Sequence, residues 1–106
     1  MSHLHDVIDT YHHGLQAASR GDWILAARWF RLCHTYYEEG ELPVFWQEVK
    51  DCGLDAVRQY AICTRHLTAA ELSELGDGRY TDWRTFVRQE LAAIARNGHK
   101  ERAARW

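Results

Sequence analysis

Histidines gather near the start of the chain, where they could bind a metal ion. The four are His3, His5, His12 and His13. His5 and His12 are seven positions apart, so on a helix they would share one face, two turns apart, and could approach a common ion only loosely. No H-E-x-x-H pattern and no neighbouring cysteine accompanies them. We therefore expect no metal site, and we interpret these histidines as solvated or helix-flanking residues.

Two other combinations of residues could support catalysis if their side chains met. Cys33 and His34 could be a nucleophile and its base, but adjacent side chains on a helix point about 100° apart and cannot hydrogen-bond. Glu38, Glu39 and Glu41 could supply an acid and a base, but nothing around them indicates the apolar burial that would raise the pKa of one carboxyl. No glycine-rich stretch has the length or the Lys-Ser or Lys-Thr ending of a phosphate-binding loop. We therefore expect a protein that is not an enzyme and that takes no cofactor, nucleotide or small-molecule substrate.

Helices are the elements that must position any functional side chain. A length of 106 residues allows one domain, and 46% apolar and 26% charged residues are close to globular averages. Pro43 is the only proline, and the glycines fall mostly where helices would end, which favours long helices over strands. We expect a single all-α domain over residues 1–106, folded as a compact bundle of about five helices.

Apolar spacing predicts the first three helices. A stripe at intervals of three and four residues indicates a helix over about 3–19, and Gly21-Asp22 then supplies a turn and an N-cap. The second helix, over about 23–38, is apolar on two faces, so it is either central in the bundle or offers one face to a partner. Pro43 suits the first turn of a third helix that reaches about Arg65 and that Gly53 is expected to kink or divide.

The last two helices are predicted from their caps. Thr68 and Glu71 have the spacing of a capping box and should open a short fourth helix. Thr81 or Asp82 should cap the fifth helix, and Asn97-Gly98 should end it. Residues 98–106 are then expected as a frayed helix or as a loose basic tail.

The three cysteines and the N-terminal segment indicate the cellular compartment in which we expect the protein. Cys33, Cys52 and Cys63 are odd in number and lack C-x-x-C spacing, so we interpret them as small core residues in a reducing environment. The N-terminus shows no basic region followed by an apolar run, and no window approaches the ~20 apolar residues of a membrane span. We expect a cytoplasmic protein that does not bind membranes.

Tryptophan is several times more frequent than usual, with five residues in the chain. A core of this size can fully bury only some of them, and tryptophan, tyrosine and arginine are the residues that concentrate binding energy at interfaces. An aromatic core without a partner would explain the same composition. The other reading is a surface for another protein, or a homodimer face, on the second helix and beside the acidic segment that follows it. Its candidate residues are Trp29, Leu32, Tyr36, Phe45 and Trp46.

Charge is unevenly distributed along a chain whose formal net charge is only −2. Six acidic side chains and the single Lys50 lie between Glu38 and Asp55, whereas seven basic and three acidic side chains lie between Arg79 and the last residue. The small net charge identifies neither nucleic acid nor an anionic membrane as the partner of the whole chain.

Residues 4–37 resemble one helical hairpin of the tetratricopeptide type, above all in the stretch Gly21-Asp-Trp-Ile-Leu-Ala26-Ala-Arg-Trp-Phe30. In such a hairpin glycine opens the turn, Trp23 packs on the first helix, and Ala26 lets the two backbones approach closely. The pattern occurs once, and arrays of such repeats need about three copies to bury a continuous core. We therefore expect a tetratricopeptide-like N-terminal hairpin inside a bundle. The resemblance implies protein or peptide binding.

Residues 67–99 resemble the helix-turn-helix part of a winged-helix DNA-binding protein. The second of its two helices would enter the major groove with Arg84 and Arg88, and the basic tail would add phosphate contacts. The spacer between the helices is longer than usual, and no β-wing pattern follows Gly98. An ordinary amphipathic helix with a solvated arginine face is the alternative. The candidate nucleic-acid-binding residues are Arg84, Arg88, Arg96, Lys100 and Arg102.

A short, tryptophan-rich helical chain of this kind also resembles the accessory proteins of enterobacterial prophages and phage satellites. That resemblance implies a small regulator or inhibitor, encoded by a mobile element, that acts by binding one protein. Our leading prediction is therefore a non-enzymatic, protein-binding helical module. The alternative is a DNA-binding regulator that uses the C-terminal half of the chain.

Overall fold

Five helices make up most of the described chain. The computed structural model describes residues 3–40 and 46–104, with side chains up to residue 97, and no strand lies in those ranges. The helices are α1 (Leu4–Ser19), α2 (Trp23–Glu39), α3 (Gln47–Arg65), α4 (Ala69–Leu75) and α5 (Trp83–Ala104). The predicted all-α bundle of five helices is thus confirmed. None of the described helices combines the length and the hydropathy that crossing a membrane requires.

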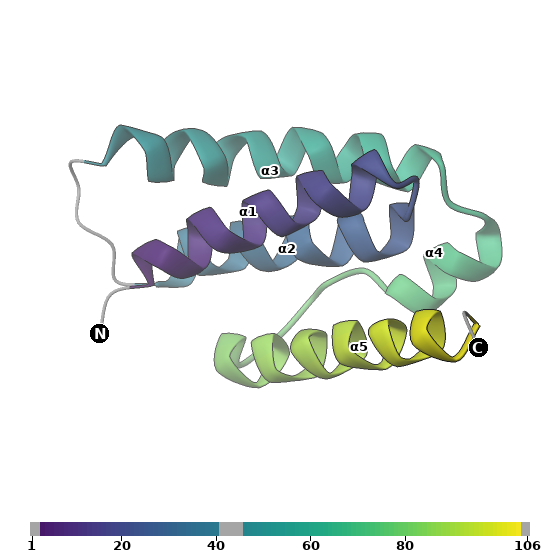
Figure 1. Cartoon of the computed structure of the whole chain (residues 1–106). Helices are drawn as coiled ribbons and strands as arrows, with labels where there is room; N and C mark the ends of the chain where they lie inside the picture. The colour runs from purple at the N-terminus through teal and green to yellow at the C-terminus, as the bar shows by residue number, and fades with distance from the viewer. Residues whose placement is uncertain (1–2, 41–45, 105–106) are drawn as a thin grey trace.

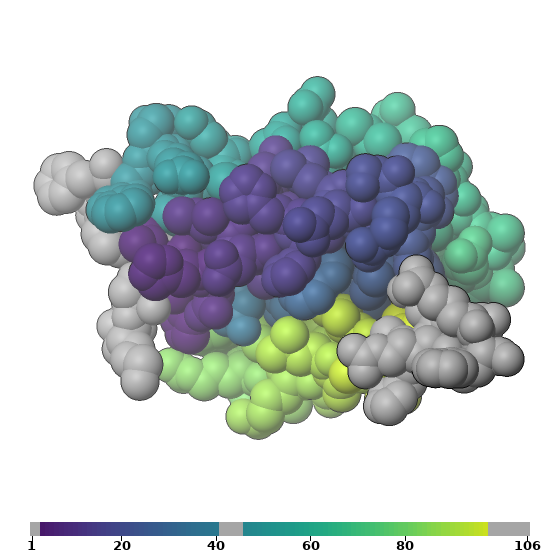
Figure 2. Space-filling view, in the orientation of Figure 1, coloured from purple at the N-terminus to yellow at the C-terminus, as the bar shows by residue number. Residues whose placement is uncertain are grey.

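The second helix lies at the centre of the bundle. In the described chain α2 contacts each of the other four helices, and α1 and α3 also contact each other. Figure 1 shows α1, α2 and α3 side by side, with α5 on the side of α2 away from α3. Figure 2 shows α1 covering the face turned toward the viewer, between α3 and α5. Of the two positions that the sequence left open for this doubly apolar helix, the central one is correct.

The central position of α2 removes most of its second apolar face from the surface. Leu32 is fully buried and Tyr36 is buried, and the Tyr36 ring meets the Trp83 ring at the start of α5 edge-on, with 6.3 Å between ring centroids. The expectation that Leu32 and Tyr36 would be exposed is therefore wrong. The physical reason is that α5, predicted as a separate element, packs on this face.

Glycines let aromatic side chains of α2 approach the neighbouring helices. A Cβ atom at Gly14 of α1 would lie 2.7 Å from Cε1 of Phe30, and a Cβ atom at Gly53 of α3 would overlap the ring of Tyr37. α3 runs through Gly53 as one helix, so the predicted division there is wrong. The glycine serves close packing, because it leaves room on its helix for a ring.

Most of the predicted helix ends are close to the observed ones. The Asp22 side chain accepts from the backbone N–H of Leu25 at 3.4 Å, and Thr68 with Glu71 forms the predicted capping box. α3 begins at Gln47, and Pro43, predicted in its first turn, lies outside the described residues.

The predicted end of the last helix is wrong. α5 continues through Asn97-Gly98 to Ala104 instead of stopping there, so of the two alternatives expected for residues 98–106 the helical one agrees with the structure up to Ala104. A glycine inside a helix costs only about 1 kcal/mol relative to alanine, and the residues that follow Gly98 are mostly strong helix formers.

Three buried cysteines and a hydrogen bond between α1 and α3 also contribute to the packing of the first three helices. Cys33, Cys52 and Cys63 are free and buried, as predicted, and burial raises the pKa of the Cys33 thiol to about 12. The Tyr11 hydroxyl of α1 donates to Asp55 of α3. Burial first, and this bond next, raise the pKa of Tyr11 to about 12, and the same bond lowers the pKa of the Asp55 carboxyl.

A buried group of three charged side chains joins α5 to α2. Arg28 donates to Glu90 Oε1 at 3.1 Å, and Arg31 donates to the same oxygen at 2.7 Å. All three side chains are less than one-tenth exposed. Arg31 Nε and Glu90 Oε2 are buried without a hydrogen-bond partner. The pairing compensates the charges only in part, because two guanidinium groups share one carboxylate.

We predict that Gly14→Ala destabilises the protein, although alanine is the better helix former by about 1 kcal/mol. The new methyl group would press on the Phe30 ring, which is fully buried and cannot move into solvent. Overpacking of a filled core typically costs about 1–3 kcal/mol. Urea unfolding followed by circular dichroism measures the change in the free energy of unfolding. The same substitution in a Phe30→Leu background should cost less, and a gain in stability from Gly14→Ala alone would contradict this packing.

We predict that Glu90→Ala lowers the free energy of unfolding by about 3–5 kcal/mol, because it leaves two buried guanidinium groups without a counter-charge. Thermal and urea unfolding measure the loss. Glu74→Ala is the matched control, since Arg28 uses only the backbone carbonyl of Glu74 and the Glu74 side chain is exposed. A loss for Glu90→Ala no larger than that for the control would show that this cluster does not hold α5 in place.

Candidate binding groove

Arg31 of α2 holds the start of the segment between α4 and α5. Gly76 and Gly78 have positive φ angles of 72° and 75°, a conformation that glycine adopts without strain. Arg31 donates to the carbonyls of Leu75 at 2.8 Å and Gly76 at 3.2 Å. A Cβ atom at Gly78 would lie 2.9 Å from Cδ of Arg31, so the glycine is also needed for the close approach. We call residues 76–82 the connecting loop.

Tyr80 of the connecting loop is fixed at both ends of its side chain. Its ring stacks on Phe86 of α5, with ring centroids 5.1 Å apart, and its hydroxyl donates to Glu39 Oε1 at 3.1 Å. Burial, together with the nearby Glu39 carboxylate, raises the pKa of the Tyr80 hydroxyl. Tyr80 lines two surface hollows.

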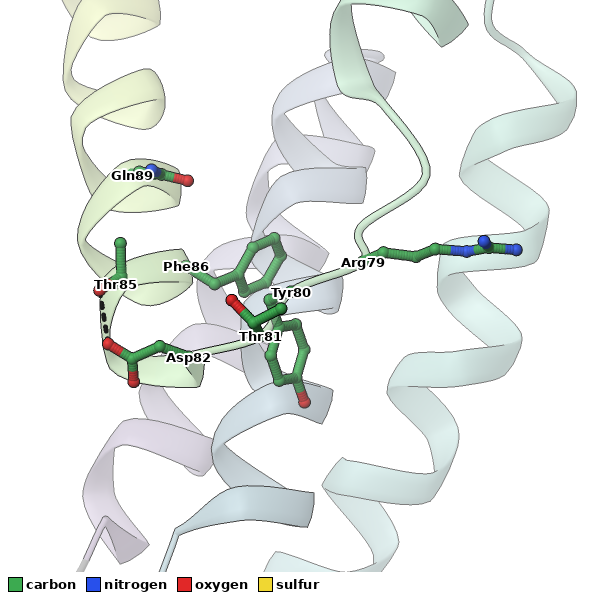
Figure 3. A pocket seen from close by; sticks show the side chains of 7 residues that line it. All are labelled: Arg79, Tyr80, Thr81, Asp82, Thr85, Phe86 and Gln89. Carbon is green, nitrogen blue, oxygen red and sulfur yellow. Dashed lines mark hydrogen bonds between the residues drawn. The ribbon is translucent and has the colours of Figure 1, made fainter.

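The first hollow lies between the connecting loop and the start of α5. It has a volume of about 620 Å³, is open to solvent, and is lined by Arg79, Tyr80, Thr81, Asp82, Thr85, Phe86 and Gln89. Figure 3 shows the rings of Tyr80 and Phe86 at its centre and the Arg79 side chain pointing away toward α3. Asp82 accepts from the Thr85 hydroxyl at 2.6 Å and from the backbone N–H of Arg84 at 3.3 Å, which fits the predicted capping role. Three of the polar side chains of this hollow are therefore occupied or turned away: Asp82 and Thr85 bind each other, and Arg79 points away.

The second hollow lies between α2 and α3, and we call it the α2–α3 groove. It has a volume of about 280 Å³ and its edge is completed by the connecting loop. Phe30 and Ala56 are fully buried within it, whereas Val57 remains 47% exposed. The lining residues are Phe30, Arg31, His34, Thr35, Glu38, Ala56, Val57, Tyr60, Asp77, Gly78 and Tyr80.

The α2–α3 groove is suited to binding an apolar group. Its volume lies just below the roughly 300–1,000 Å³ of typical small-molecule pockets, so it suits one or two side chains better than a drug-sized molecule. His34 faces Glu38, with Nε2 to Oε1 at 3.0 Å, while Cys33 donates to the carbonyl of Val7 and does not line the groove. The described residues contain no group of three or more histidine, cysteine or acidic side chains that could hold a metal ion.

The predicted protein-binding residues are not brought together. Leu32 and Tyr36 lie in the core, and Trp29 is half-buried with its ring stacked on His13 at 4.6 Å. Trp46, which precedes α3, is 48% exposed. Phe45 lies outside the described residues.

Histidines pack on three of the tryptophans. The ring of His66 stacks on Trp23 with centroids 3.9 Å apart, and His3 meets Trp83 edge-on at 5.3 Å, in addition to the pair formed by His13 and Trp29. These three tryptophans are half-buried and lie against the core. The expectation that some indoles would lie near the surface is confirmed for the described residues, where none is fully buried.

The predicted nucleic-acid-binding arginines are all on α5. Arg84, Arg88 and Arg96 are exposed, and none forms an ion pair with a carboxylate in the part of the chain that the structure describes. The Arg84 guanidinium lies over the Trp83 ring, 4.9 Å from its centroid, and Arg88 donates to the Thr85 hydroxyl. Lys100 and Arg102 lie within α5, but their side chains are outside the description.

The exposed apolar residues in and beside the α2–α3 groove were not among those predicted from the sequence. Val57 and Leu54 are apolar residues on the otherwise polar outer side of α3, 47% and 52% exposed. Apolar residues that depart from the buried stripe of an amphipathic helix were the available signal. The sequence contained no such signal for Tyr80, because a tyrosine in a loop becomes part of a groove only where α2 lies beside it.

Known proteins provide no functional assignment for this chain, so a proposed function must rest on the groove and surface residues described above. No protein-family model, curated protein or solved structure matches the chain.

Proposed function

We propose that this chain is a protein-binding helical module that uses the α2–α3 groove and the adjoining outer side of α3. The exposure of large apolar side chains there is the observation that supports it. Leu54 and Val57 are about 60° apart around α3, so they face the same side. Both are about half exposed, and Val57 also lines the groove beside Tyr60 and Tyr80. Apolar side chains gathered beside a groove are typical of interaction sites.

The module acts in this proposal as a small regulator or inhibitor and not as an enzyme. Its described cysteines are buried, and burial raises the pKa of the thiols, which opposes the reactive thiolate form. Binding through an open groove alters a partner by covering part of the partner's surface. The resemblance to prophage and phage-satellite accessory proteins agrees with such a role. We also propose a cytoplasmic location, since three free cysteines suit a reducing compartment.

Val57→Asp should abolish capture of the partner, because it places a charge on the apolar edge of the α2–α3 groove. Tagged wild-type protein and the variant are used as baits in lysate of the native host, and captured proteins are quantified by mass spectrometry. We expect at least a tenfold loss of one specific protein. Light scattering of the purified chain measures whether that protein is a second copy.

Leu91→Asp is the matched control for this experiment. Leu91 is 41% exposed on α5 and does not line the α2–α3 groove. The Leu91→Asp variant should capture as much of the partner as the wild type does. Equal capture by wild type and Val57→Asp, or equal loss with both variants, would contradict the proposed site.

DNA binding is a second candidate because Arg84, Arg88 and Arg96 are exposed without a carboxylate partner in the described residues. In this proposal α5 binds duplex DNA through these arginines, so affinity falls steeply as salt rises, and Arg84→Ala or Arg88→Ala weakens binding. Fluorescence anisotropy with a labelled duplex at 50 and 200 mM salt measures both effects. The absence of binding at the lower salt concentration would remove this candidate.

A further inference from the structure

The C-terminal end of α2 carries negative charge that the helix itself does not compensate. Glu38 and Glu39 lie in its last turn, and that turn has no basic residue. The end of a helix already bears a partial negative charge from its free carbonyl groups, so carboxylates there are unfavourable and a cation would be favourable. A basic group supplied from outside the chain would therefore be stabilised at this position.

The same carboxylates lie at the α2–α3 groove. Glu38 lines the groove and its side chain is 53% exposed, while Glu39 accepts from the hydroxyl of Tyr80, which also lines it. Asp77 lines the groove from the connecting loop with a side chain that is 73% exposed. Three carboxylates thus lie in or beside a groove whose floor is apolar.

The basic groups near the groove leave this negative charge largely uncompensated. Arg31 is directed to Glu90 and to the carbonyls of Leu75 and Gly76. The Arg79 guanidinium contacts Asp77 only at 3.6 Å and its side chain is 91% exposed, while the Arg79 backbone N–H donates to Asp77 Oδ1 at 3.0 Å. His34 contacts Glu38 at 3.0 Å and carries a charge only when it is protonated. Glu38 and Glu39 have no arginine or lysine within ion-pair distance among the described residues.

We propose that the partner of the α2–α3 groove is a protein segment that carries an apolar side chain next to lysine or arginine. The apolar side chain packs on the accessible Val57, Tyr60 and Tyr80, and the neighbouring cation contacts Glu38 and Glu39. This inference rests on the proposed function and specifies its partner. Complementary charge at the rim adds selectivity and faster association to the contact that the apolar surface provides.

Three capped tripeptides, Arg-Trp-Arg, Gln-Trp-Gln and Glu-Trp-Glu, test the proposal on the full chain. Each is titrated into ¹⁵N-labelled protein, and dissociation constants are obtained from the shifts of the backbone amides of Val57, Tyr60 and Tyr80. We expect the basic peptide to bind at least threefold more tightly than the neutral one and the acidic peptide to bind more weakly than both. The preference for the basic peptide should shrink when salt is added, because exposed charges are screened.

Charge-removing variants separate the two parts of the proposal. The double variant Glu38→Gln, Glu39→Gln should abolish the preference for the basic peptide over the neutral one. Its matched control is the double variant Glu48→Gln, Asp51→Asn, which removes two exposed carboxylates of α3 that do not line the groove. That control should retain the preference.

The outcomes distinguish failure of the inference from failure of the proposed function. If all three peptides bind at the groove with equal affinity, or if the α3 control variant loses the preference as well, the proposed partner chemistry is wrong and the groove remains a binding site. If none of the peptides shifts the groove resonances, the proposed partner chemistry is also overturned. The proposed function is then decided by the Val57→Asp capture experiment, which does not depend on the charge of the partner.

Discussion

The aromatic side chains of α2 pack where the neighbouring helices carry no side chain, and the arrangement of the bundle depends on this contact. Phe30 lies against Gly14 of α1, and Tyr37 lies against Gly53 of α3. A ring that contacts backbone allows the helix axes to come close, so α1 and α3 can both cover one side of α2 and also contact each other. The other side of α2 is then left for α5, and α2 becomes the one helix that contacts every other described helix.

α5 is held on this remaining side by apolar contact and by the charged cluster of Arg28, Arg31 and Glu90. Burying charge gains little net stability, because each group loses its hydration. The cluster has a different consequence here. Arg31 also donates to the carbonyls of Leu75 and Gly76, so one side chain contacts both α5 and the start of the connecting loop that carries Tyr80. The edge of the α2–α3 groove is therefore set by the buried contacts of α2.

The aromatic composition and the candidate site have a common cause in the small size of the bundle. The half-buried Trp23, Trp29 and Trp83 pack on the core with one side and on histidine rings with another, which explains how the molecule holds them without full burial. Exposed apolar surface remains elsewhere, on α3 at Leu54 and Val57 and at Trp46 before it. The proposed binding surface is thus on exposed residues of α3, and the tryptophan count alone did not locate it.

Local interactions within the sequence were sufficient to predict the helices, because caps and apolar periodicity act between residues three or four positions apart. The capping box of Thr68 and Glu71, the cap at Asp22 and the buried stripes containing the three cysteines all follow from such spacing. Tertiary structure alone decided that Leu32 is buried, that Tyr36 meets Trp83 of α5, and that Val57 and Tyr80 line one groove. Those outcomes depend on contacts such as that between Arg28 and Glu90, which are 62 positions apart. Packing of whole helices determines which distant residues meet, and no local pattern encodes it.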